Sequence, residues 1–117
     1  MRRTVSAGAL SLAVLTAACG GSASATTPGS IKVTLTEFKY STSTIELKAG
    51  DKATLDLKNA GAVEHDFVVD AASLKVSIQP GKSATRTIGP LAAGSYEIYC
   101  SVPGHKESGM KAQLIVR

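Results

Sequence analysis

Three side chains that can bind a metal ion lie close together near the end of the chain. Cys100, His105 and Met110 fall within one eleven-residue stretch and offer a thiolate sulfur, an imidazole nitrogen and a thioether sulfur. Soft and borderline donors at this density indicate a metal site. Two histidines and one cysteine with a weak axial methionine suit a copper ion that cycles between Cu(I) and Cu(II). This chemistry therefore requires one more histidine.

The chain contains only two histidines, and the second is His65. It begins the apolar alternation His-Asp-Phe-Val-Val, far before Cys100 in the sequence. Strands that are distant in sequence can be neighbours in a sheet, so we expect His65 to reach the Cys100 loop. Each residue alone also fits a simpler interpretation: Cys100 as a small buried hydrophobe, His65 as a structural histidine and Met110 as core filling. Those interpretations leave the shared order and spacing to chance, so we favour the metal site.

The arrangement of these motifs resembles the cupredoxins of the plastocyanin and azurin group. The resemblance covers most of the chain after its N-terminal segment. It rests on the histidine followed by Asp-Phe-Val-Val, on Tyr-x-x-Tyr-Cys, and on Cys-x4-His-x4-Met with Pro-Gly before the second histidine. It implies one type 1 copper ion, with His65, Cys100 and His105 as equatorial ligands and Met110 as the long axial ligand.

The resemblance also implies roles for the residues that follow two of these ligands. Asp66 and Ser101 would link the two ligand segments and donate hydrogen bonds near the Cys100 sulfur, which tunes the potential of the metal. The chain departs from the better known members here, because Asn often stands where this sequence has Asp66. The loop between the cysteine and the second histidine is also longer than in plastocyanin, so the resemblance leaves the subfamily open.

Hydrophobic periodicity predicts an all-β fold. Apolar residues alternate with polar ones in short segments, and turn signals such as Gln79-Pro80-Gly81 and Gly89-Pro90 separate them. We predict seven or eight strands in a Greek-key β-sandwich of the cupredoxin type, with little helix beyond a single turn at 71–74 or 91–94. Tyr96, Ile98 and Cys100 share parity, which directs the thiol toward the interior. The alternating apolar positions are Ile31, Val33, Leu35, Ile45, Leu47, Ala53, Leu55, Leu57, Phe67, Val69, Val76, Ile78, Ala112, Leu114 and Val116.

The first residues have the features of an export signal. Arg2 and Arg3 precede a short apolar run, so we assign residues 1–18 to a signal peptide. Thr-Ala-Ala-Cys at 16–19 resembles a bacterial lipobox, which predicts lipidation of Cys19, whereas Ala-Ser-Ala at 23–25 fits ordinary cleavage. We favour the lipoprotein and keep a soluble periplasmic or secreted form as the alternative. Residues 19–30 read as a flexible linker and residues 31–117 as the cupredoxin domain.

Composition limits the classes of partner. The 117-residue chain carries a net charge of +4, of which Arg2 and Arg3 belong to the signal peptide, and its basic residues form no run. Nucleic acid is therefore not an expected partner. Without Cys19, the mature domain has Cys100 as its single cysteine. A lone thiol in an oxidising compartment needs an explanation, and metal ligation provides one.

Together these features predict a monomeric, membrane-anchored carrier of single electrons that serves redox partner proteins in an extracytoplasmic chain. The alternative is a protein that binds, stores or delivers copper through the same ligands. An enzyme with Cys100 as nucleophile and His105 as base is disfavoured, because no orienting carboxylate or oxyanion hole accompanies them and an inward thiol is a poor nucleophile.

Overall fold

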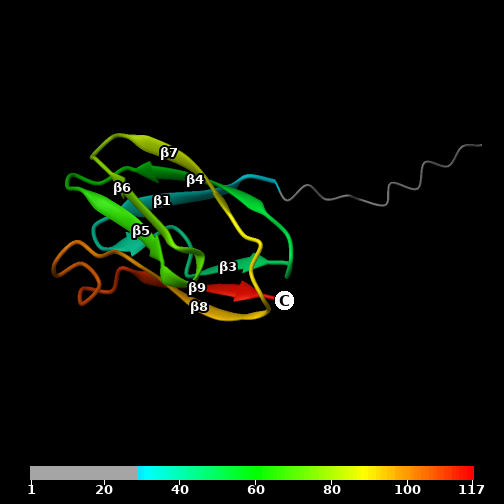
Figure 1. Cartoon of the computed structure of the whole chain (residues 1–117). Coiled ribbons are helices and arrows are strands. Elements are labelled where there is room, and N and C mark those ends of the chain that lie inside the picture. The colour runs from blue at the N-terminus through cyan, green and yellow to red at the C-terminus, as the bar shows by residue number, and fades with distance from the viewer. Residues whose placement is uncertain (1–28) are drawn as a thin grey trace, which may run out of the picture.

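A computed structural model describes residues 29–117, which form two packed β-sheets (Figure 1). In spatial order, the first sheet contains β2 (Lys39–Tyr40), β1 (Ile31–Thr36), β4 (Ala53–Asn59) and β7 (Ser83–Ile88). The second contains β3 (Thr44–Leu47), β9 (Lys111–Val116), β8 (Gly94–Tyr99), β5 (His65–Val69) and β6 (Leu74–Ile78). The chain crosses repeatedly between the sheets, and among the strands of residues 29–117 only β1 with β4 and β3 with β9 pair in parallel. The predicted Greek-key β-sandwich is confirmed.

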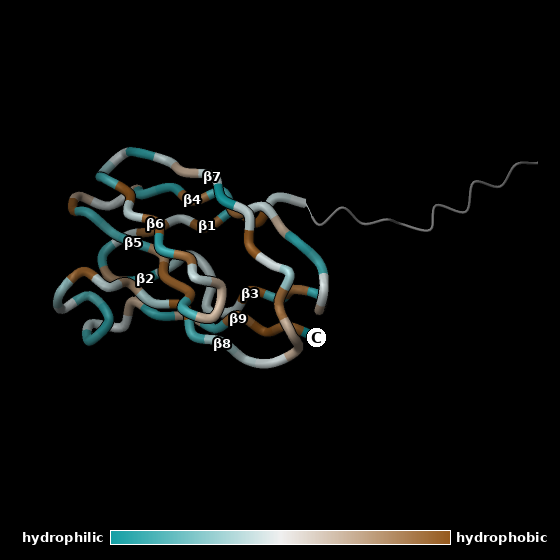
Figure 2. Tube along the Cα trace, in the orientation of Figure 1, coloured by the Kyte–Doolittle hydropathy of each residue, from teal (hydrophilic) through white to brown (hydrophobic). Residues whose placement is uncertain are grey.

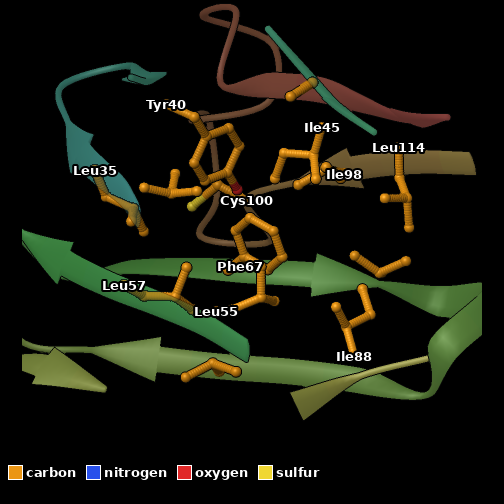
Figure 3. Close-up of a cluster of buried hydrophobic side chains, with 14 of the residues drawn as sticks. Leu35, Tyr40, Ile45, Leu55, Leu57, Phe67, Ile88, Ile98, Cys100 and Leu114 are labelled. Atoms are coloured by element: carbon orange, nitrogen blue, oxygen red, sulfur yellow. The ribbon is translucent and has the colours of Figure 1, made fainter. Parts of the chain in front are cut away.

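The core lies between the two sheets and follows from the alternation in the sequence. In β4, Ala53, Leu55 and Leu57 are buried, while the residues between them are more exposed. Hydrophobic and hydrophilic residues likewise alternate along several strands of the sandwich (Figure 2). Burying a side chain such as leucine contributes about 1.5–3 kcal/mol, so this layer supplies most of the driving force for folding. Cys100 is part of the same cluster and lies with Tyr40 and Phe67 in its interior (Figure 3).

One detail of the strand prediction differs from the structure. The described residues contain nine strands, not seven or eight, because Lys39–Tyr40 turns back along β1 as the two-residue strand β2. Two residues are too few to show a period. The helical turn lies at Asp70–Ala72, which overlaps the predicted 71–74. Residues 91–94 are not helical, and Gly94 already begins β8.

Strand β5 is covered on both faces. His65, Phe67 and Val69 are buried as the alternation predicts, but Asp66 and Val68 on the opposite face are also buried. The outer face of this strand is thus part of the packed structure, which matters for the site because Asp66 lies on it.

The loops divide between the two ends of the sandwich. The loop from Cys100 to Met110 and the loop between β4 and β5 lie at one pole, whereas residue 29 and the C-terminus lie at the other (Figure 1). No helix within residues 29–117 is long and apolar enough to cross a membrane. The predicted signal peptide, Cys19 and nearly all of the linker lie outside the described residues.

Candidate metal centre

Three of the predicted site residues meet at this loop-bearing pole. His65 is the first residue of β5, Cys100 directly follows β8, and His105 lies in the loop before β9. His65 Nδ1 is 3.1 Å from His105 Nδ1, and Cys100 Sγ is 3.5 Å from the same nitrogen. One ligand atom from each residue lies within 4.8 Å of the others, which is the spacing of donors around one ion. All three side chains are buried.

The sheet brings these distant residues together. β5 and β8 pair antiparallel through Val68 and Tyr99. This pairing aligns the beginning of β5 with the end of β8, so His65 and Cys100 lie at the same end of these two neighbouring strands. His105 then returns over them from the loop, and its ring centroid lies 4.9 Å from that of His65.

Met110 closes the same loop. Its amide donates to the His105 carbonyl oxygen at 3.0 Å, and its own carbonyl oxygen accepts from the Cys100 amide at 3.1 Å. The side chain is fully buried and belongs to the core cluster that contains Cys100. The backbone therefore joins the fourth predicted ligand directly to two of the others.

Asp66 and Ser101 contact each other across the two ligand segments. One carboxylate oxygen of Asp66 accepts from the Ser101 amide at 2.6 Å, and the other accepts from the Ser101 hydroxyl. The Asp66 amide donates to Cys100 Sγ at 3.4 Å, and its carbonyl oxygen accepts from the Tyr40 hydroxyl at 2.8 Å. The Asp66 side chain thus fixes the residue after the cysteine, while its backbone donates to the sulfur.

Two further residues at this pole were missed by the sequence reasoning. Glu37, in the turn between β1 and β2, places Oε1 3.3 Å from His65 Nε2 and accepts from the amides of Ala62 and Val63. The hydrogen bond from the Ala62 amide is the main reason that the pKa of Glu37 lies below its usual value. No sequence signal marks Glu37, because its partners are distant and it belongs to no repeating pattern.

Asn59 is the other missed residue, and it holds the loop between β4 and β5 from inside. Its amide nitrogen donates to the carbonyl oxygens of Val63 and Ile78 at 2.8 Å each, and its oxygen accepts from the Gly61 amide. In the sequence, Asn59 looks like an ordinary turn residue. In the structure it is fully buried and organises the loop that leads to His65.

The surface above the site is partly apolar. The Phe38 ring meets the His105 ring edge-on, with centroids 5.0 Å apart. Phe38 and Val63 are the exposed large hydrophobic residues of the described chain, and Pro103 and Gly104 beside His105 are also exposed. His105 retains 8% of its surface, whereas His65 retains none. His105 is therefore the histidine of the pair that reaches the surface.

The donor set fits a copper ion. Burial raises the pKa of the Cys100 thiol, so it is protonated at neutral pH without a metal, and a bound cation would displace that proton. Two imidazole nitrogens and one thiolate at a buried, preformed site are the ligands of blue copper centres. No other group of three such ligands was found within residues 29–117.

Comparisons with known proteins agree with this geometry. A family model described as a cupredoxin-like domain matches residues 8–116, so the chain belongs to the cupredoxin-like family. A single copper ion is the cofactor that the family and this donor set define. One relative, the copper-resistant cuproprotein CopI of Rubrivivax gelatinosus, is 31% identical over 68% of this chain. The match spans 61% of that relative, less than two thirds of its length.

Solved structures show the same fold. Reduced auracyanin from the photosynthetic bacterium Roseiflexus castenholzii has a TM-score of 0.68 at 22% identity. The match covers 75% of this chain and 96% of the auracyanin chain. The blue copper oxidase of Nitrosomonas europaea has a TM-score of 0.67 at 19% identity, covering 75% of this chain but 38% of its own. At these identities the likeness establishes the fold alone.

Proposed function

We propose that this protein transfers single electrons outside the cytoplasm through one type 1 copper centre held by His65, Cys100, His105 and Met110. The observation that carries the proposal is the convergence of two imidazole nitrogens and one thiol within 4.8 Å, all buried at one pole of a rigid sandwich. Copper bound there would supply a one-electron couple between Cu(I) and Cu(II).

The chain's own residues keep the ligand geometry constant. His65 begins a strand, and Cys100 is fixed by two hydrogen bonds: its amide donates to the Met110 carbonyl oxygen, and the Asp66 amide donates to its sulfur. The Met110 amide also donates to the His105 carbonyl oxygen, which fixes these two residues of the loop relative to each other. A site fixed in this way changes little between oxidation states, so electron transfer requires little reorganisation.

Electrons would enter and leave by the edge of His105. This ring reaches the surface beside Phe38, and exposed Val63, Pro103 and Gly104 surround the same pole. A small apolar area suits brief, low-area encounters with redox partner proteins, which a carrier must release quickly. We propose that the protein works in this way as a monomer.

Storage or delivery of copper is the second candidate, and one observation favours it. The relative at 31% identity is described as a copper-resistant cuproprotein. A delivery protein would surrender its metal to an acceptor or chelator, whereas a carrier would complete many oxidation and reduction cycles with its copper content unchanged. Counting copper before and after such cycles in the presence of a chelator separates the two functions.

We also propose that the protein is exported, with residues 1–18 as signal peptide and Cys19 as the site of a lipid anchor. Cys19 directly ends the apolar run and is followed by small residues, which supports this assignment. Fractionation tests it: Cys19→Ala should move the protein from the membrane to the soluble extracytoplasmic fraction, and unchanged membrane association would contradict the anchor.

The central test is a copper titration of the mature domain with visible and paramagnetic resonance spectra. We expect an intense thiolate-to-Cu(II) charge-transfer band that appears at one equivalent of copper. Cys100→Ser should abolish the band and leave the sandwich folded, because the two side chains differ little in size. In the full chain, Cys19→Ser is the matched control and should stay blue. A blue Cys100→Ser variant would refute the ligand assignment.

A further inference from the structure

Glu37 joins the turn between β1 and β2 to the side of His65 that faces away from the other ligands. Its Oε1 lies 3.3 Å from His65 Nε2, while His65 Nδ1 lies 3.1 Å from His105 Nδ1. The same oxygen accepts from the Ala62 amide at 2.7 Å and the Val63 amide at 3.1 Å. The carboxylate is thus fixed by the loop that leads to His65, although its side chain retains 34% of its surface.

The hydrogen-bonding capacity of these groups determines which nitrogen of His65 carries the hydrogen. An ionised carboxylate only accepts, and a neutral imidazole has one N–H donor and one lone pair. Nε2 must therefore donate to Glu37, which leaves the Nδ1 lone pair directed at His105 and Cys100. Without a metal, His105 Nδ1 must then donate to His65 Nδ1, because two lone pairs at 3.1 Å would repel each other.

Gly61 provides the space for this contact. A Cβ atom on this residue would lie 2.4 Å from Glu37 Oε1 and 2.9 Å from His65 Nε2, closer than real Cβ contacts. Any larger residue at position 61 would separate the carboxylate from the imidazole. The loop therefore supplies two amide donors to Glu37, and it places Gly61, which has no side chain, where Glu37 meets His65.

We infer that Glu37 is a positioning residue that holds His65 in its Nε2–H tautomer and so presents the Nδ1 lone pair to the metal site. Carboxylates that accept from a metal-binding histidine fix its ring and raise its basicity, and their loss weakens metal binding about 10–100-fold. This inference rests on the proposed function for the ligand role of His65, but the tautomer itself belongs to the metal-free protein.

The experiment begins with the copper-free, reduced protein labelled with 15N at histidine. Long-range proton–nitrogen correlation spectra report which ring nitrogen carries the hydrogen. We expect a single Nε2–H form of His65 in the wild type and a mixture of forms in Glu37→Ala. Glu37→Gln should keep the Nε2–H form, because its amide oxygen can still accept from His65.

Copper binding provides the second measurement. With Cu(I) titrated anaerobically against a chromogenic chelator, we expect Glu37→Ala to bind about 10–100-fold more weakly than the wild type. Gly61→Ala should show the same loss with the carboxylate still present. Glu64→Gln is the charge control: its carboxylate binds Ser77 and not His65, so tautomer and affinity should not change. Gly29→Ala is the glycine control, because nothing lies within 4 Å of its added Cβ.

Two results would overturn the inference. One is an Nδ1–H form of His65 in the wild type. The other is a folded Glu37→Ala variant with an unchanged tautomer and Cu(I) affinity within twofold of the wild type. A wild type that binds no copper would instead refute the proposed function, while the tautomer measurement would still decide the role of Glu37.

Discussion

The contact between Asp66 and Ser101 can be tested through stability. Asp66 retains 3% of its surface, and its two carboxylate oxygens accept from the amide and the hydroxyl of Ser101. These bonds join the start of β5 to the beginning of the ligand loop. Asp66→Ala removes both acceptors and leaves the Ser101 amide without its partner.

The magnitude follows from these contacts. A hydrogen bond to a charged group contributes about 1.5–3 kcal/mol, so two bonds amount to about 3–6 kcal/mol. Removing the carboxylate also removes the cost of burying its charge, and exposed Ser101 can bind water in its place. We therefore expect Asp66→Ala to lower the free energy of unfolding by about 2–4 kcal/mol. Asp66→Asn keeps an acceptor for the Ser101 amide and should lose about 1 kcal/mol.

The measurement is urea unfolding of the copper-free domain, supported by thermal melts. A loss of 2–4 kcal/mol in a domain of this size lowers the Tm by roughly 10–25 °C. Asp56→Ala is the matched control, because the Asp56 carboxylate also accepts two hydrogen bonds, from the hydroxyls of Ser30 and Thr85, but its residue is only half-buried. The free energy of unfolding should fall clearly less in Asp56→Ala than in Asp66→Ala. An Asp66→Ala variant as stable as Asp56→Ala would refute the reasoning, as would an Asp66→Asn variant as unstable as Asp66→Ala.

Three further predictions concern the same pole. Met110→Leu conserves volume and should lower the free energy of unfolding by less than about 1.5 kcal/mol. It should raise the reduction potential of the copper site, because a weak donor that favours Cu(II) is lost. An unchanged potential in voltammetry would exclude Met110 as a ligand. Asn59→Ala leaves the carbonyl oxygens of Val63 and Ile78 without a buried donor and should lower the unfolding free energy by about 2–4 kcal/mol in urea. Iodoacetamide should modify Cys100 slowly in the copper-free protein, because the thiol is buried and its pKa is raised, and not at all after copper loading; mass spectra showing equal rates would argue against ligation.

The sequence predicts the sandwich because the strands follow from local patterns, and it names three donors, His65, Cys100 and His105, that the structure brings together. Period-two alternation assigns Ala53, Leu55 and Leu57 to the core, and the structure buries all three. The shared parity of Ile98 and Cys100 likewise places the thiol inside. His65 could be paired with the distant cysteine because the chain has no other candidate histidine.

The contacts that support the site depend on tertiary geometry and were not predictable in the same way. Glu37 reaches His65 only because β1 and β4 pair in parallel and bring the β1–β2 turn beside the β4–β5 loop. Nothing in the residues around Glu37 distinguishes it from other surface acids. Asn59 carried a turn signal, but its buried bonds to Val63 and Ile78 require the register of two sheets.

The placement of residue 29 and the C-terminus at one end of the sandwich gives the domain a direction. The six residues of β1 span roughly 20 Å, which separates that end from the histidines. A fusion, a resin or an electrode linker joined after residue 117 would therefore leave the His105 edge facing outward. Immobilised molecules would all present the same face to the solution, whereas attachment through an added cysteine in the 101–109 loop would hide it.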